Sequence, residues 1–254
     1  MSEAGSLIRS LSGRTAARNF HTFVINEIGS GIVSGRFPVG SILPNDAVMI
    51  ETYGVSRTVL REALRTLEAK GLVEARPKVG TRVSPRSRWN FFDAQVLSWH
   101  FEAPLDAEFC DSLFDTRLAL ETRTARLASK RRTAEHVRPL KFWVHQMELA
   151  ADSVESHALA ELEVHRILAE TSGNPLLRSV LGLVELTLAL AATAGTLEEN
   201  RATRLASTAE HEALVAAVEA GAADAAVASI ERIIAIGLAQ TLKRAMPATV
   251  PRDG

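Results

Sequence analysis

The stretch Val55–Gly71, VSRTVLREALRTLEAKG, most strongly limits what this chain can fold into. Its Val, Leu and Ala residues recur at helical spacing and centre at about 270° on a wheel of 100° per residue that starts at Arg57. On the same wheel Arg57, Arg61 and Arg65 lie at about 0°, 40° and 80°. The pattern predicts a helix that packs with one face and presents three guanidinium groups on another.

A solvated charged face is the alternative explanation for these arginines. On such a face Glu62 and Glu68 would alternate more evenly with the basic residues. The arginine stripe therefore favours a polyanionic partner.

Two further helices and a hairpin surround this stretch. Apolar residues at helical spacing predict a helix over residues 19–34, and Asn45 is a candidate cap for a short second helix. Ser56 caps the arginine helix, and Gly71 ends it. The segment LVEARPKVGTRVSP alternates apolar and polar residues around a turn and predicts a two-stranded hairpin. Residues 18–86 are thus expected to form a winged helix-turn-helix domain.

The charge of the chain is divided unevenly. Residues 1–88 contain 13 Lys and Arg against 7 Asp and Glu, whereas residues 89–254 contain 16 against 23. A basic first part attached to an acidic second part fits contact with nucleic acid by the first part alone. Chance segregation of charge is the alternative explanation of this feature.

The rest of the chain is predicted to be helical, so the fold class is mainly α. Residues 1–17 are expected to form a flexible arm, residues 87–104 a linker with a short helix, and residues 247–254 a flexible tail. Residues 105–246 are expected to form an antiparallel bundle for ligand binding and dimerisation. Its expected helices cover residues 106–131, 133–151, 157–172, 175–195, 201–220 and 222–245.

Composition excludes several classes of protein. The only cysteine, Cys110, cannot form an intramolecular disulfide, so a cytoplasmic location is expected. The N-terminus shows no signal-peptide pattern. The most apolar segment, residues 180–195, is interrupted by Glu185 and is shorter than the ~20 residues that a membrane span needs, which predicts a buried helix.

Residues 42–83, ILPNDAVMIETYGVSRTVLREALRTLEAKGLVEARPKVGTRV, resemble the DNA-binding module of the GntR family of bacterial transcription regulators. The combination of LP, GVSR, REAL..L...GL and a wing that ends in G..V carries this resemblance. FDTRLALETRTARLAS (114–129), ELEVHRILAETSGNPLL (161–177) and AEHEALVAAVEAGAADAA (209–226) resemble the FCD ligand-binding domain of the FadR-type branch. Together the resemblance spans about residues 18–240.

The resemblance implies which residues contact operator DNA. A guanidinium can bind guanine through two hydrogen bonds, and hydroxyls suit phosphate. The implied contacts are Ser56, Arg57, Thr58, Arg61 and Arg65 on the third helix, and Arg76, Lys78, Gly80 and Arg82 in the wing. Some family members use an arginine on the second helix where this chain has Ala47, so their operator sequence cannot be transferred. A homodimer on a palindromic operator is expected.

The resemblance also implies a divalent metal in the bundle. Glu161 and His165 are four residues apart and project from one helix face, and His211 lies on a later helix. Family members use a carboxylate, usually Asp, and three histidines, but the third histidine position corresponds here to Ile233. Such ligands suit Zn, Ni or Mn-like ions. Ordinary hydrogen bonding of two histidines and a glutamate is the alternative.

Arg117 matches the family arginine that binds the carboxylate of a small effector, for which its planar fork of donors is suited. The alternative is an intrahelical pair with Glu121, four residues later. The segment RSRWNFFDAQVLSW is similar to that of regulators of sugar-acid catabolism, particularly galactonate-responsive repressors. The resemblance therefore implies a repressor that an aldonate or related small carboxylate releases from DNA.

An enzyme is the alternative from another functional class. Glu161, His165 and His211 around an ion could form a metal-dependent hydrolase, but HEALV at 211–215 has Val215 where a zincin has its second histidine. No nucleophile elbow or phosphate loop occurs in the sequence. A purely structural helical adaptor explains neither the arginine stripe nor the wing, so we do not expect an enzyme or an adaptor.

Overall fold

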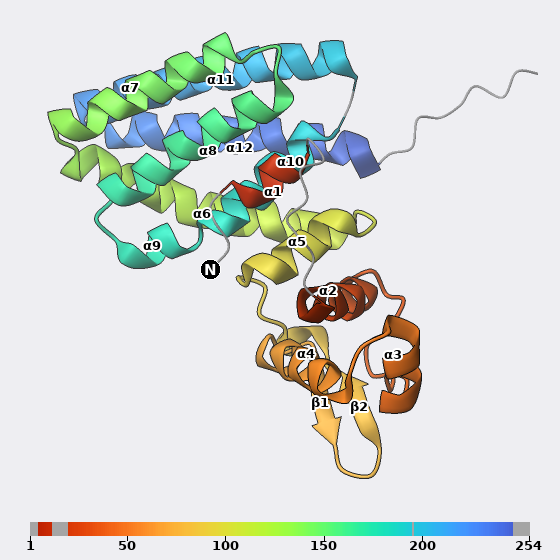
Figure 1. Cartoon of the computed structure of the whole chain (residues 1–254). Helices are drawn as coiled ribbons and strands as arrows, with labels where there is room; N and C mark the ends of the chain where they lie inside the picture. Colours follow the sequence, from red (N-terminus) through yellow and green to blue (C-terminus); the bar gives the residue numbers. More distant parts are fainter. Residues whose placement is uncertain (1–4, 12–19, 195, 246–254) are drawn as a thin grey trace, which may run out of the picture. The chain divides into compact units, whose positions relative to one another are not determined.

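The computed structural model describes residues 5–11, 20–194 and 196–245 and is mainly α-helical, as the sequence predicts (Figure 1). It consists of two compact units. One unit is Thr15–Pro104, and the other combines Leu105–Gly254 with Met1–Arg14.

The first unit is the expected winged helix-turn-helix. Its elements are α2 (Phe20–Val33), α3 (Asp46–Tyr53), α4 (Arg57–Ala69), β1 (Val73–Arg76), β2 (Gly80–Val83), the 3₁₀ turn η1 (Arg86–Arg88) and α5 (Ala94–Glu102). Leu60, Ala63 and Leu67 of α4 are fully buried and pack with the apolar face of α2. The apolar face predicted for the arginine helix therefore forms the core of this unit.

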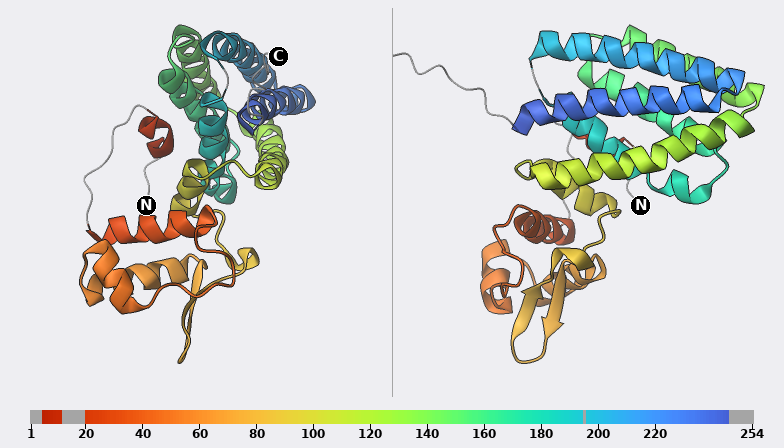
Figure 2. Two further views of the ribbon diagram at one scale, coloured as in Figure 1. Left: turned by 90° about the vertical axis from the view of Figure 1, so that its right-hand side faces the viewer. Right: turned by 180° about the vertical axis from the view of Figure 1, so that it is seen from behind.

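Local signals in the sequence position α3, α4 and the hairpin. The Asn45 side chain accepts a hydrogen bond from Val48 N at 3.1 Å, and the Ser56 hydroxyl accepts one from Val59 N at 3.3 Å. Both predicted caps are confirmed. Gly71 follows α4 with φ 78°, a conformation that residues with a side chain seldom adopt. Strands β1 and β2 pair antiparallel and project beyond the helices of this unit (Figure 2).

The segment expected to be a linker is part of this unit. Helix α5 packs on α2 through Trp99, which is 1% exposed. Gly29 makes this contact possible, because a Cβ atom there would lie 2.4 Å from the Trp99 ring. Asp93 caps α5 and also forms an ion pair of 2.7 Å with Lys70, at the end of α4. Both contacts join segments distant in sequence, which the local pattern of residues 87–104 does not reveal.

The second unit is an antiparallel bundle of long helices (Figure 2). Its helices after residue 104 are α6 (Ala107–Arg131), α7 (Ala134–Leu149), α8 (Val154–Thr171), α9 (Pro175–Ser179), α10 (Leu181–Ala192), α11 (Leu197–Ala220) and α12 (Ala223–Ala245). Helix α12 packs against α6, α10 and α11, and α7 packs against α8 and α11.

Three boundaries in the bundle differ from the sequence prediction. Helix α8 begins at Val154 rather than at residue 157, because the Ser153 hydroxyl caps it by accepting from Ser156 N at 3.3 Å. The single helix expected over residues 175–195 is divided at Val180, whose φ of −95° and ψ of 11° interrupt the helix. Helix α9 buries no residue, whereas α10 is buried on most sides. Helix α11 begins near residue 197 rather than 201, because Thr196 and Glu199 form a capping box.

Part of the expected N-terminal arm is a helix of the second unit. Helix α1 (Ser6–Ser10) packs on α8 and α10, and Ile8 is fully buried. Glu185 of α10, itself only 7% exposed, accepts hydrogen bonds from the backbone of Leu7 at 2.6 Å and Ile8 at 3.3 Å. This carboxylate accepts hydrogen bonds from backbone amides at the start of α1 that have no partner within the helix. Sequence patterns do not reveal this role, because the two segments are nearly 180 residues apart. Residues 1–4 and 12–17 of the expected arm lie outside the described residues.

Helix α12 contains a stretch, Ala223–Lys243, that by length and composition alone could cross a membrane. It packs against α6, α10 and α11, and 39% of this stretch is buried. The tail expected over residues 247–254 lies outside the described residues.

Candidate nucleic-acid interface and ligand site

Helix α4 presents its arginines to solvent. Arg57 and Arg61 are exposed, and neither has an ion-pair or hydrogen-bond partner among the described residues. Thr58 is exposed beside them, and the Ser56 hydroxyl caps the helix. Since α3 and α4 form a helix-turn-helix, α4 is the element that such domains place in the major groove. The first turns of α4 therefore offer two free guanidinium groups to DNA.

Three of the other predicted DNA contacts, Arg65, Arg76 and Arg82, differ from Arg57 and Arg61 in having partners within their own unit. Arg65 forms an exposed ion pair of 2.7 Å with Glu62. Arg76 pairs with Glu74 at 2.7 Å, and the Arg82 side chain donates a hydrogen bond of 2.9 Å to the backbone oxygen of Gly40. Exposed pairs of this kind contribute only ~0–1 kcal/mol, so DNA phosphates can compete for these arginines.

The tip of the hairpin holds Lys78 in an uncommon backbone conformation. Val79 N donates to Arg76 O at 3.1 Å across a turn in which Lys78 has φ 63°. A side-chain-bearing residue with positive φ is uncommon and occurs preferentially in functional turns. Gly80, with φ 115°, follows and begins β2. The turn leaves the Lys78 side chain exposed at the end of the wing.

Arg117, by contrast, is 1% exposed within the bundle and has three partners. Its Nε donates to Glu121 at 2.6 Å and its Nη1 to the Thr187 hydroxyl at 3.0 Å. Its Nη2 lies 3.0 Å from Nε2 of His165. The intrahelical pair with Glu121, which the sequence left as an alternative, is therefore present. Thr187 lies 70 residues from Arg117, and no sequence pattern indicated it.

Glu121 connects Arg117 to the histidines. One carboxylate oxygen binds Arg117, and the other lies 2.5 Å from Nδ1 of His165. Burial alone would raise the pKa of Glu121, but its contacts with His165 and Arg117 hold that pKa at about 2. Glu121 is thus an ionised carboxylate in the bundle core at neutral pH.

The contacts of the two histidines assign their tautomers. A guanidinium can only donate, so Nε2 of His165 accepts from Arg117 and its Nδ1 carries the proton. His211 Nδ1 lies 2.8 Å from the backbone oxygen of Ser207, so it is the donor and His211 Nε2 carries a lone pair. Burial and the neighbouring His165 lower the pKa of His211 to about 3, which keeps this ring neutral.

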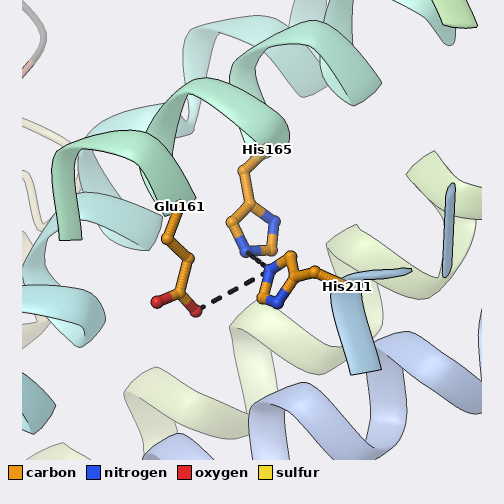
Figure 3. A group of neighbouring side chains, drawn as sticks. All are labelled: Glu161, His165 and His211. Carbon is orange, nitrogen blue, oxygen red and sulfur yellow. Dashed lines mark hydrogen bonds and ion pairs between the residues drawn. The ribbon is translucent and has the colours of Figure 1, made fainter. Parts of the chain in front are cut away.

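The three predicted metal ligands lie together (Figure 3). The Nε2 atoms of His165 and His211 are 3.4 Å apart, and Oε1 of Glu161 is 3.8 Å from His211 Nε2. Two nitrogens that bind one tetrahedral zinc ion at ~2.0–2.1 Å are separated by about 3.3 Å. The spacing of the two Nε2 atoms therefore suits a shared cation, although the single lone pair of His165 Nε2 now accepts from Arg117 Nη2. Nδ1 of His211 donates to the Ser207 backbone oxygen, and Nδ1 of His165 faces the Glu121 carboxylate at 2.5 Å without hydrogen-bond geometry. Ile233, at the expected third histidine position, is 2% exposed and offers no ligand atom.

A cavity of about 60 Å³ lies beside these ligands. Its apolar wall includes Leu188, Ile233 and Ile236. Its polar lining consists of Arg117, His157, Glu161, Asn200, Thr203, Arg204, Ser207 and Gln240. No sequence pattern indicated Arg204. His157 and Ser207 were also missed, although helical spacing places His157 on the face of Glu161 and Ser207 on that of His211. His157 lies 3.7 Å from Glu161 and 3.1 Å from the Thr208 hydroxyl, so it helps to orient that carboxylate.

Comparison with known proteins accounts for both units. Residues 21–83 match the family of bacterial regulatory proteins called gntR, and residues 112–235 match the FCD domain. The uncharacterised HTH-type transcriptional regulator YieP of Escherichia coli K12 is 34% identical over 170 residues, which cover 66% of this chain and 74% of that protein. The chain belongs to the GntR family.

Two other relatives of this GntR regulator have names that state what they regulate. The galactonate operon transcriptional repressor of E. coli K12 is 29% identical and is matched over 62% of this chain and 69% of its own. The fatty acid metabolism regulator protein of Cronobacter sakazakii is 35% identical, over 63% of this chain and 65% of its own. The GntR regulator is thus a FadR-type transcriptional regulator with an FCD domain. Its families and relatives are regulators rather than enzymes, as the sequence analysis expected.

Proposed function

We propose that this GntR regulator is a homodimeric cytoplasmic repressor that a small sugar acid releases from a palindromic operator. The observation that carries this proposal is a cavity of the bundle that Arg117, His157 and Glu161 line beside His165 and His211. The α4 helix of the same chain presents arginines that have no partner among the described residues. The cavity supplies hydrogen-bond donors for a carboxylate ligand, and α4 supplies cationic side chains for the phosphates and bases of DNA.

On the operator, Arg57 and Arg61 read base edges in the major groove. Ser56 and Thr58 contact the adjacent phosphates, and Lys78, Gly80 and Arg82 bring the wing to the minor groove. Arg65 and Arg76 exchange their ion pairs with Glu62 and Glu74 for phosphate contacts. A two-fold dimer places one α4 in each half of a palindrome.

In the bundle, Glu161, His165 and His211 hold a divalent cation of the Zn, Ni or Mn type. The bound ion would supply a Lewis-acid site for an oxygen atom of the effector. Ser207 and Glu121 fix the two rings through their Nδ1 atoms. Arg117 Nη2 now occupies the lone pair of His165 that an ion needs. An ion held by these residues would take that lone pair, and Arg117 Nη2 would then be available to donate to the carboxylate of the effector.

The cavity favours a small hydroxylated acid over a long acyl chain. A long acyl chain needs an extended apolar channel, whereas buried amide groups of Asn200 and Gln240 line this cavity. The hydroxyl groups of a sugar acid can replace the water that such groups would otherwise bind. The galactonate operon repressor, a relative of this regulator, is named for a sugar acid of this class.

Binding and release of operator DNA test the regulatory part of the proposal. Purified protein should bind a palindrome near its own promoter in a gel shift, and added galactonate or a related sugar acid should release it. Affinity should fall steeply with salt, because bound phosphates displace counterions. The absence of any preferred palindrome would refute operator binding by α4. An effector that leaves the complex intact would refute the role given to the cavity.

Elemental analysis tests the metal site. Wild-type protein purified without chelator should contain about one divalent ion per chain, and His165→Ala and His211→Ala should lose most of it. His145→Ala is a matched control, because His145 is exposed on α7 outside the cavity. Equal metal content in all four proteins would exclude the proposed ligands.

A further inference from the structure

Arg204 of α11 lines the same cavity as Arg117 and Glu161. It lies on α11 seven residues before His211, so the two side chains leave the same helix face about two turns apart, or roughly 10 Å. Ser207 lies between them on that face and also lines the cavity. Arg117 contacts His165, and Arg204 leaves α11 two turns before His211, so the two cationic residues line different parts of the cavity.

The Arg204 side chain is held in place but its charge is not neutralised. Its Nε donates a hydrogen bond of 2.7 Å to the backbone oxygen of Ala151, which fixes the plane of the guanidinium. Among the described residues no carboxylate lies within ion-pair distance of it. The neighbouring carboxylate of Asp152 instead pairs with Arg201 at 2.6 Å. The two terminal nitrogens of Arg204 thus keep donors for a ligand.

Arg166, another partly buried arginine of the bundle, differs in this respect. Arg166 pairs with both Glu163 and Glu170, and although burial lowers its pKa, these contacts raise it overall. Burial lowers the pKa of Arg204, and the opposing effect of Asp152 does not compensate. A half-buried cation without a counter-charge is costly unless an anion joins it.

The residues around Arg204 supply further donors. Asn200 and Gln240 are buried, and Gln240 Nε2 donates to Asn200 Oδ1 and, at 2.8 Å, to the backbone oxygen of Ala194. Because the Asn200 oxygen is the acceptor, its amide NH₂ remains a donor. Among the described residues this NH₂ has no hydrogen-bond partner. The Arg204 end of the cavity is therefore rich in donors and holds one uncompensated positive charge.

We propose that Arg204 binds a second acidic group of the effector, so that the effector is a dianionic sugar acid. Its first carboxylate binds at the end formed by Arg117, Glu161 and the histidines, as under the proposed function on which this inference rests. Its second group, a terminal carboxylate or phosphate, binds Arg204 and Asn200. A six-carbon chain with the two groups at its ends suits a separation of about two helical turns.

Titration calorimetry with matched ligands tests this assignment on the full chain. The ligand sets are galactonate with galactarate, and gluconate with glucarate and 6-phosphogluconate, which compare one acidic group with two. Wild type should bind at least one dianion roughly 10- to 100-fold more tightly than its monoanion. Arg204→Gln should remove this preference, so that dianion affinity falls to that of the monoanion. Within the gluconate set, glucarate and 6-phosphogluconate distinguish a second carboxylate from a phosphate.

Two variants control for loss of charge and loss of structure. Arg232→Gln removes the same charge from α12 at an exposed pair with Glu210 outside the cavity, and it should keep the preference. Arg204→Lys keeps the charge without the planar fork, and it should keep part of the preference. Thermal unfolding of each variant verifies folding.

Two results would overturn the assignment of Arg204: a wild type without preference for any dianion, or a preference that survives Arg204→Gln. In both cases binding and DNA release by monoanions would leave the proposed function standing. If no sugar acid of either charge binds or releases DNA, the proposed function itself fails.

Discussion

The arginines of α4 and the arginine of α6 show opposite uses of one residue type. Arg57 and Arg61 are exposed and have no partner among the described residues, whereas Arg117 is 1% exposed and binds Glu121, Thr187 and His165. An exposed guanidinium keeps its donors for an external polyanion. A buried one requires internal partners, because an uncompensated charge in the core would prevent folding. The comparison indicates that α4 is organised for recognition, and that Arg117 supports both the structure and the ligand site.

The largest expected difference concerns stability. Arg117→Met should lower the free energy of unfolding of the bundle by about 3–5 kcal/mol, because it leaves the Glu121 carboxylate buried without its guanidinium. Arg65→Met, which breaks the exposed pair with Glu62, should cost less than about 1 kcal/mol. Urea unfolding followed by far-UV circular dichroism measures both. Similar losses in the two variants would contradict the distinction between buried and exposed arginines.

Acid should destabilise the bundle through the same network. The pKa of His211 falls from 6.5 to about 3 on folding and that of Glu121 from 4.5 to about 2, so in these ranges the unfolded chain binds more protons. The free energy of unfolding should therefore fall as pH drops below about 6.5, by at most about 1.4 kcal/mol per unit for each proton.

Unfolding of chelated protein at successive pH values measures this slope. His211→Gln should flatten the profile between about pH 6.5 and 4.5, where His211 contributes and Glu121 does not yet do so. A wild-type profile that is flat from pH 7 to pH 4 would show that the fold does not hold His211 in its neutral form.

The smallest expected effect is the difference between Arg61 and Arg65 of α4 in the sequence preference of DNA binding. Arg61→Ala should weaken operator binding by about 1–3 kcal/mol and relax sequence preference at one base pair. Arg65→Ala should weaken binding to all sequences alike, since Arg65 already has Glu62 and offers at most a phosphate contact. Competition gel shifts with specific and random DNA distinguish the two. Equal loss of specificity would place Arg65 among the base-reading residues.

Local signals carried most of the fold prediction. Asn45 and Ser56 begin helices by accepting hydrogen bonds from residues three positions later, and Gly71 ends one through its own backbone conformation. These interactions depend on neighbours in the sequence, so the sequence alone predicts them. The alternation of residues around the hairpin turn is equally local.

The candidate ligand site was predicted in part. The helical spacing of Glu161 and His165 placed them on one face, and resemblance to the GntR family added His211, which the structure brings to them. Thr187 and Arg204 were missed, because their relevance depends on which faces of α6, α10 and α11 meet. The same is true of His165 and Glu121, which lie 2.5 Å apart on different helices.

Sequence by itself determined the winged domain, the helical bundle and the arginine face of α4, because hydrophobic periodicity and caps are short-range properties. Only the tertiary structure decided that α5 packs on α2 through Trp99 and that Glu185 receives the start of α1. It also decided that the Arg117 guanidinium pairs with Glu121, whereas Arg204 has no counter-charge among the described residues. The physical reason is that a buried charge is defined by its partners in space, and these partners come from helices far apart in the chain.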